Sequence, residues 1–137
     1  MPKFVVITGV TRGLGRAMAV EFARSGCSVA GCGRSENKIE SLGNELGQAH
    51  DFEALDISSD EAVKAWAAGL MAARGPADLL LNNAGVINRN SPLWKISAQE
   101  FSVIIDVNLK GIANVIRHFA PPMIERKKGV IVNFSSG

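Results

Sequence analysis

Residues 4–15 read FVVITGVTRGLG, an apolar run followed by a segment with three glycines. The continuous run of mostly β-branched residues is typical of a strand buried on both faces of a parallel sheet. Helical spacing follows Gly15. A glycine-rich turn between a strand and a helix directs backbone N–H groups and the positive helix end toward phosphate. The stretch therefore predicts a phosphate-binding loop that opens a β–α–β unit.

The spacing of the three glycines narrows this interpretation. Gly9, Gly13 and Gly15 follow the pattern Gly-x-x-x-Gly-x-Gly. The commoner dinucleotide fingerprint is Gly-x-Gly-x-x-Gly, and a P-loop needs a Gly-Lys-Ser/Thr that is missing here. A tight turn without a ligand remains the alternative.

The rest of the chain continues the alternation of strand and helix. Further apolar runs lie at 28–32, 52–55, 79–81 and 130–132. Ser58 with Glu61, and Ser97 with Glu100, have the spacing of helix-capping boxes. The proline pair 121–122 is expected to end or kink the last long helix. This order predicts one α/β domain over residues 1–137, an open, doubly wound parallel sheet with strand order 3-2-1-4-5.

The long helix, expected over 98–120, has one narrow polar stripe. Its members are Ser102, Asp106, Lys110, Asn114 and Arg117, with Asp106 and Lys110 as an i,i+4 pair. Asn108 lies off this stripe among isoleucines, and a buried amide must be hydrogen-bonded. From spacing alone it could equally be a core asparagine that caps a strand end.

Composition excludes several classes of protein. The net charge of +2 is too small to indicate a nucleic-acid or membrane partner. No apolar stretch is long enough for a membrane span, and the N-terminus lacks the pattern of a signal peptide. Cys27 and Cys32 have no metal-ligand spacing with a histidine, so no metal site is predicted. We expect a soluble, cytoplasmic protein.

The end of the second strand bears on which dinucleotide would bind. NAD sites usually place an acidic residue about 20 residues after the glycine loop, to hold the ribose 2′-hydroxyl. Here Gly33, Arg34 and Ser35 stand in that region. Arginine suits a 2′-phosphate, and Arg12 could add a second cation. The alternatives are a surface arginine at a strand end, or Glu36 acting as the acidic residue of an NAD site.

Three more motifs complete a pattern. Asp56-Ile57 ends the third strand, Asn82-Asn83-Ala84-Gly85 follows the fourth, and 133–137 reads NFSSG after the fifth. Together with the glycine loop, the chain resembles the short-chain dehydrogenase/reductase family along its whole length. The resemblance implies an oxidoreductase that transfers hydride between NADP(H), with NAD less expected, and the carbonyl or alcohol carbon of a small molecule.

The resemblance also implies roles for matching residues. Ser136 would be the catalytic serine, with Ser135 as its rival, and Asn108 would position a water in the proton path. Asp56 would hydrogen-bond the adenine amino group, with Ile57 beside the ring. The residues expected to bind the cofactor are Gly9, Thr11, Arg12, Gly13, Leu14, Gly15, Arg34, Ser35, Asp56, Ile57, Asn83, Ala84 and Gly85.

The chain departs from the family in one respect. The family's acid/base is a tyrosine in a Tyr-x-x-x-Lys motif on the helix after the fifth strand, and this chain contains no tyrosine. We expect the sequence to be the N-terminal part of a longer enzyme and to be inactive alone. An uncovered fifth strand would also be prone to aggregation, so we expect no stable monomer of 137 residues. The alternative is a non-catalytic dinucleotide-binding or interaction module. The helix 98–120 is expected to form a homodimer or homotetramer interface.

Overall fold

The computed structural model describes residues 3–87 and 90–135. A five-stranded parallel sheet has the order β3-β2-β1-β4-β5. Its strands are β1 (Phe4–Thr8), β2 (Ser28–Gly33), β3 (Asp51–Ala54), β4 (Leu79–Asn82) and β5 (Val130–Asn133). The helices are α1 (Gly13–Arg24), α2 (Glu36–Leu46), α3 (Asp60–Arg74), the 3₁₀ turn η1 (Leu93–Lys95), α4 (Ala98–Ile105), the π-helical segment η2 (Asp106–Gly111) and α5 (Ile112–Arg126). The predicted fold class and strand order are confirmed.

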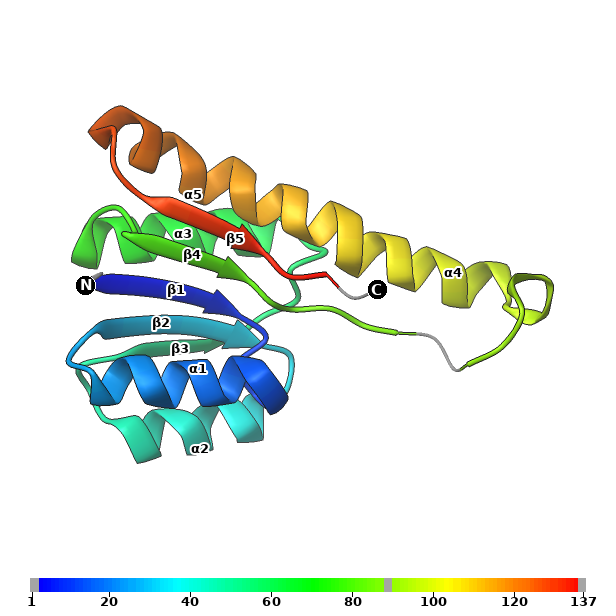
Figure 1. The fold of residues 1–137 in the computed structure, drawn as a ribbon, viewed down its shortest axis with the longest axis horizontal. Coiled ribbons are helices and arrows are strands. Elements are labelled where there is room, and N and C mark those ends of the chain that lie inside the picture. Colours follow the sequence, from blue (N-terminus) through cyan, green and yellow to red (C-terminus); the bar gives the residue numbers. More distant parts are fainter. Residues whose placement is uncertain (1–2, 88–89, 136–137) are drawn as a thin grey trace.

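The central strands are buried on both faces because helices cover both. In Figure 1, α1 and α2 lie on one side of the sheet and α3 and α5 on the other. Alternate side chains of β1 therefore enter different cores: Val5 and Ile7 meet α1 and α2, whereas Val6 meets α3 and α5. This explains why the strand sequences are continuously apolar rather than alternating.

Both helices for which the sequence suggests a serine cap begin with a serine, but one of the two caps is shifted by one residue. Ser97 Oγ accepts a hydrogen bond from the Glu100 N–H at 3.1 Å, as expected. The cap of α3, however, is Ser59, whose Oγ accepts from the Ala62 N–H at 3.3 Å. The predicted cap, Ser58, donates its hydroxyl instead to Asp56 Oδ1 at 2.8 Å. The adjacent carboxylate is the stronger acceptor and takes the hydroxyl.

The long helix differs from its prediction in three ways. It contains the π-helical segment η2, and it continues through Pro121 and Pro122 to Arg126, so the prolines do not end it. Each proline lacks the N–H that would make a helical hydrogen bond. Phe119 and Met123, on either side of the proline pair, are buried, and their packing offsets this loss. Asn114, assigned to the polar stripe, is buried, whereas the Asp106–Lys110 pair forms at 3.0 Å.

One half of this helix has little to pack against. In Figure 1, α4 extends beyond the sheet, and it contains no buried residue. Three large apolar side chains on α4 and η2 are substantially exposed: Phe101 at 47%, Val103 at 45% and Leu109 at 61%.

Within the described residues, no helix is long and apolar enough to cross a bilayer.

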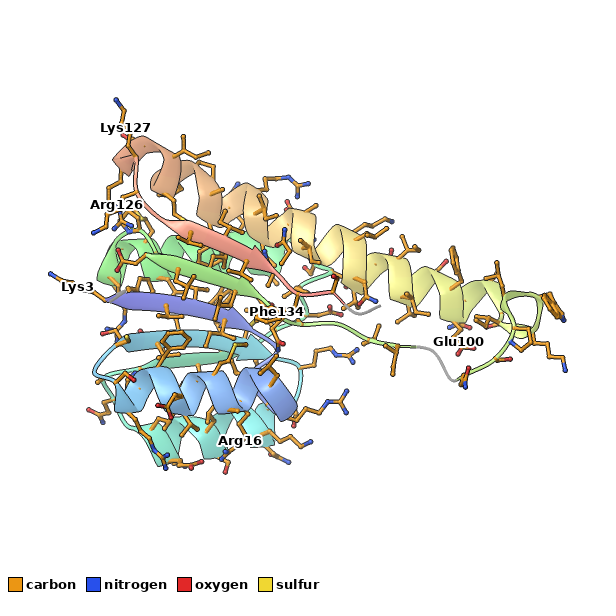
Figure 2. All side chains as sticks on the ribbon, in the orientation of Figure 1. Lys3, Arg16, Glu100, Arg126, Lys127 and Phe134 are labelled. Carbon is orange, nitrogen blue, oxygen red and sulfur yellow. The ribbon has the colours of Figure 1, made fainter. Side chains whose placement is uncertain are left out.

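The Asp78 carboxylate connects the start of β1 to the end of α5, at the amino ends of the strands. This edge of the sheet is opposite the one that carries the sequence motifs. Its Oδ2 accepts from the N–H groups of Lys3 and Phe4 at 3.0 and 2.8 Å, and its Oδ1 lies 3.1 Å from the Arg126 guanidinium. Figure 2 shows Lys3 and Arg126 at this end of the molecule. Burial alone would raise the pKa of the Asp78 carboxyl, but the two N–H groups and Arg126 lower it below its usual value.

The Asp78→Asn substitution is expected to destabilise the full-length protein by about 1–2 kcal/mol at neutral pH, because it removes charge-assisted hydrogen bonds. The folded-state pKa is lowered, so the contribution of the carboxylate is complete above the unfolded value of about 3.9 and is lost below it. Urea denaturation at pH 7 and at acid pH measures this. A difference that persists unchanged in acid would contradict the assignment.

Candidate cofactor-binding site

A cavity of about 400 Å³ opens at the carboxyl ends of β1, β2 and β4. Strands β1 to β3 are added toward one edge of the sheet and β4 and β5 toward the other, so the strand order reverses between β1 and β4. Open α/β sheets bind ligands at this point. The cavity is lined by Gly9, Thr11, Arg12, Gly13, Cys32, Gly33, Arg34, Ser35, Lys38, Leu55, Asp56, Ile57, Asn83, Ala84, Gly85, Val86 and Val107.

The glycine turn forms the floor of the cavity and requires glycine at its first position. Gly9 has φ +73°, and a Cβ there would lie 2.8 Å from the Ala84 Cα. The N–H groups of Gly9 and Val10 both donate to the Cys32 carbonyl, at 2.9 and 3.1 Å. The turn is thereby fixed to β2 on one side and to the segment after β4 on the other.

Asn83 and Thr8 hold the turn against the segment after β4. The Asn83 side-chain amide donates to the carbonyls of Thr8 and Gly9 at 3.2 and 3.1 Å. The Thr8 hydroxyl accepts from the N–H groups of Asn83 and Ala84 at 3.1 and 2.9 Å. The neighbouring Asn82 instead ties β4 to β5 through Asn133 at 2.8 Å. Side-chain bonds thus replace a strand ladder where β1 and β4 diverge.

The start of α1 at the cavity is left open for an acceptor. The N-cap residue Arg12 makes no side-chain cap bond within the described chain, whereas serines cap α2, α3 and α4. The first N–H groups of a helix need partners from outside the helix. Together with the positive end of the helix dipole, they suit a bound anion.

Three cationic side chains line the same cavity. Arg12, Arg34 and Lys38 line the cavity, are exposed, and pair with no carboxylate in the part of the chain that the structure describes. Lys38 was not anticipated from the sequence. It lies in the first turn of α2, four positions after Arg34, and that proximity is the signal that could have identified it.

Cys32 also lines the cavity, but its chemistry is inert. Its side chain is fully buried, and burial raises the pKa of the thiol to about 12. The thiol therefore stays protonated at neutral pH and is not a nucleophile. Its contribution is the backbone carbonyl that anchors the glycine turn.

The opposite wall is the turn after β3. Asp56 Oδ1 accepts from both the N–H and the hydroxyl of Ser58, at 2.9 and 2.8 Å. No described residue bonds Oδ2, which leaves that oxygen as an acceptor at the cavity. Ile57 is 5% exposed and gives the wall its apolar surface.

Asn108 does not line the cavity itself but bonds the backbone of Val86, which does. Its Nδ2 donates to the Val86 carbonyl at 2.7 Å and its Oδ1 accepts from the Val86 N–H at 2.9 Å. It lies in the π-helical segment η2, a geometry common at functional sites. Asn108 is only partly buried and holds a loop beside β4, which resembles the strand-end role that its spacing left open.

Most of the residues expected at the cofactor come together. Gly9, Thr11, Arg12, Gly13, Arg34, Ser35, Asp56, Ile57, Asn83, Ala84 and Gly85 line the cavity. Leu14 and Gly15 do not, because Leu14 is exposed on α1 and Gly15 is buried under the turn. Ser136 lies outside the described residues. Besides Lys38, the cavity residues that the sequence did not assign to the cofactor are Cys32, Gly33, Leu55, Val86 and Val107.

Comparison with known proteins identifies this architecture. A family model described as short chain dehydrogenase matches residues 3–137. The chain belongs to the short-chain dehydrogenase family. It is 47% identical over 135 residues to the "NADPH-dependent pterin aldehyde reductase" of Arabidopsis thaliana, covering 97% of this chain and 56% of that protein. It is 39% identical over 132 residues to "Serine 3-dehydrogenase" of Rhizobium radiobacter, covering 96% of this chain and 53% of the relative.

Solved structures agree with this assignment. A metagenomic short-chain oxidoreductase in complex with NADP superposes with a TM-score of 0.90 at 37% identity, over 98% of this chain and 62% of that one. The chain therefore spans little more than half the length of these relatives. The family resemblance seen in the sequence is confirmed.

The packing under the glycine turn predicts opposite effects for two glycine-to-alanine changes in this member of the family. A Cβ on Gly15 would lie 1.9 Å from the Gly9 carbonyl oxygen, so Gly15→Ala should destabilise by about 1–3 kcal/mol. Gly69, in the interior of α3, has nothing within 4 Å of a Cβ, so Gly69→Ala should stabilise by about 0.5–1 kcal/mol. Thermal and urea unfolding measure both. Equal effects would show that Gly15 has room.

Proposed function

We propose that the full-length protein is an NADP(H)-dependent oxidoreductase that transfers hydride between the nicotinamide and the carbonyl or alcohol carbon of a small molecule. The observation that carries the proposal is the cavity at the carboxyl edge of the sheet. It joins an uncapped helix start to three unpaired cations of the described chain. The "NADPH-dependent" relative at 47% identity supports the choice of cofactor.

The cavity offers groups that fit each part of NADP(H). The open N–H groups at the start of α1 suit the diphosphate. Arg34 and Arg12, with Ser35 and Lys38 nearby, suit the 2′-phosphate. The free oxygen of Asp56 and the apolar face of Ile57 suit the adenine, and the segment 83–85 would lie along the adenosine ribose.

Hydride transfer is the chemistry that the cofactor supplies when bound. Reduction of a carbonyl places hydride on carbon and a proton on oxygen, so the protein must orient the substrate and deliver the proton. We assign the first task to Ser136, which would hold the substrate oxygen, and support of the proton relay to Asn108. We propose that a tyrosine and a lysine in a continuation of the chain complete the set.

The cofactor preference can be tested at Arg34. Replacing Arg34 with Ala should weaken NADPH binding about 10- to 100-fold, because a charge-assisted pair with phosphate is lost. Binding of NADH should hardly change. Titration of both cofactors into the full-length protein measures this. Arg24→Ala, an exposed arginine at the far end of α1, is the matched control. Equal losses for the two cofactors would show that Arg34 does not contact the 2′-phosphate.

The activity itself can be tested with NADPH and a panel of small aldehydes and ketones. Loss of NADPH absorbance that depends on both substrate and full-length protein is the expected result. Tight NADPH binding without turnover of any carbonyl or alcohol would instead favour a non-catalytic dinucleotide-binding module.

We further propose that α4 and α5 contribute to a homodimer or homotetramer interface. The support is the exposed apolar surface of α4 and η2, with Phe101, Val103 and Leu109. Light scattering on the full-length protein should therefore give a mass above that of the monomer. Phe101→Glu should lower that mass. A full-length monomer would indicate that this surface is covered within one chain.

A further inference from the structure

The wall that carries Asp56 and Ile57 is held from behind by a buried amide. Asn114 of α5 is 6% exposed, and its Nδ2 donates to the Ile57 carbonyl at 2.9 Å. A buried amide that loses its partner costs stability, so this bond fixes the turn after β3 relative to α5. None of the roles proposed above uses Asn114.

The orientation of this amide is set by an ionic cluster. The Arg117 guanidinium donates to Asn114 Oδ1 at 2.7 Å and to Asp60 Oδ1 at 2.6 Å. A guanidinium has no acceptor, so the amide oxygen must face Arg117 and the NH₂ group must face Ile57. Hydrogen bonds from His118, and then from Arg117, lower the pKa of Asp60, so this anchor stays charged at neutral pH.

The turn has little freedom to move once Asn114 is in place. Gly111 lies directly against Ile57, since a Cβ there would be 2.7 Å from the Ile57 Cδ1. On the cavity side, the Ser58 N–H and hydroxyl hold the Asp56 carboxylate. The contacts from α5 and those within the turn together fix the Asp56 oxygen and the Ile57 side chain at the cavity.

The same helical segment also holds the other wall. Asn108 bonds both backbone groups of Val86, six residues before Asn114 bonds Ile57. Val86 and Ile57 both line the cavity. One continuous run from η2 into α5 therefore holds two loops through two amides, with Gly111 between them allowing close approach.

We propose that Asn114 is a positioning residue for the adenosine half of the cofactor. It sets the place of the turn that carries Asp56 and Ile57, and so the affinity for adenine, without touching the cofactor. The proposal rests on the proposed function, since it requires that NADP(H) occupies this cavity.

The test compares Asn114→Leu and Asn114→Asp in the full-length enzyme. Both should raise the Kd for NADPH and for adenosine 2′,5′-bisphosphate about 3- to 10-fold, the effect of one lost hydrogen bond. The kcat at saturating NADPH should change by less than about twofold, because the Asn114 side chain bonds Ile57 and Arg117, and neither is assigned to the nicotinamide end. Asp keeps the shape and the contact with Arg117 but turns an acceptor toward the Ile57 carbonyl. Wild-type affinity in Asn114→Asp would therefore overturn the proposal.

Two controls separate positioning from general stability. Asp78→Asn removes charge-assisted bonds at the opposite end of the sheet, so it should lower the unfolding free energy without changing the Kd for NADPH. If Asn114→Leu fails to fold, Arg117→Met leaves the amide present but unfixed and should weaken binding of both ligands. Unchanged binding in Arg117→Met and Asn114→Asp would contradict the proposal. A wild-type protein that does not bind NADPH would instead contradict the proposed function.

Discussion

The close contact between the glycine turn and the segment after β4 is the constraint on which the cavity depends. β1 and β4 are neighbours in the sheet, yet their chains diverge beyond their last residues. The Thr8 hydroxyl and the Asn83 amide supply four hydrogen bonds across that divergence. Gly9 permits the approach because a Cβ would meet the Ala84 Cα. The space that remains between these segments and the end of β2 is the cavity.

The sheet could be predicted from sequence because its physical signal is local and strong. Continuous β-branched runs, separated by segments with helical spacing, leave few alternatives to a doubly wound parallel sheet. The glycine turn, Arg34 and Asp56 could be placed at its carboxyl edge for the same reason. In parallel sheets, strand ends that are distant in sequence meet at one edge.

The features that could not be predicted from the sequence depend on which of several neighbouring groups makes a given contact in the folded chain. Ser58 and Ser59 are equivalent as helix caps until the Asp56 carboxylate takes the Ser58 hydroxyl. Prolines 121 and 122 normally oppose a helix, but α5 continues through them, with buried residues on both sides that stabilise it. The π-helical segment leaves no mark in the polar spacing, and it changes which side chains face the core. Asn114 is therefore buried although the stripe assigned it to the polar face.

That change of register links the helix to the cavity. In an uninterrupted α-helix, two residues six positions apart, such as 108 and 114, point in directions that differ by about 120°. Both amides nevertheless reach backbone groups of cavity-lining loops, Val86 in one case and Ile57 in the other. Asn108 lies in the π-helical segment η2 and Asn114 in α5, and each side-chain amide makes two hydrogen bonds. The helix thus serves as a common support for the two walls, and displacement of either loop disturbs hydrogen bonds on the same element.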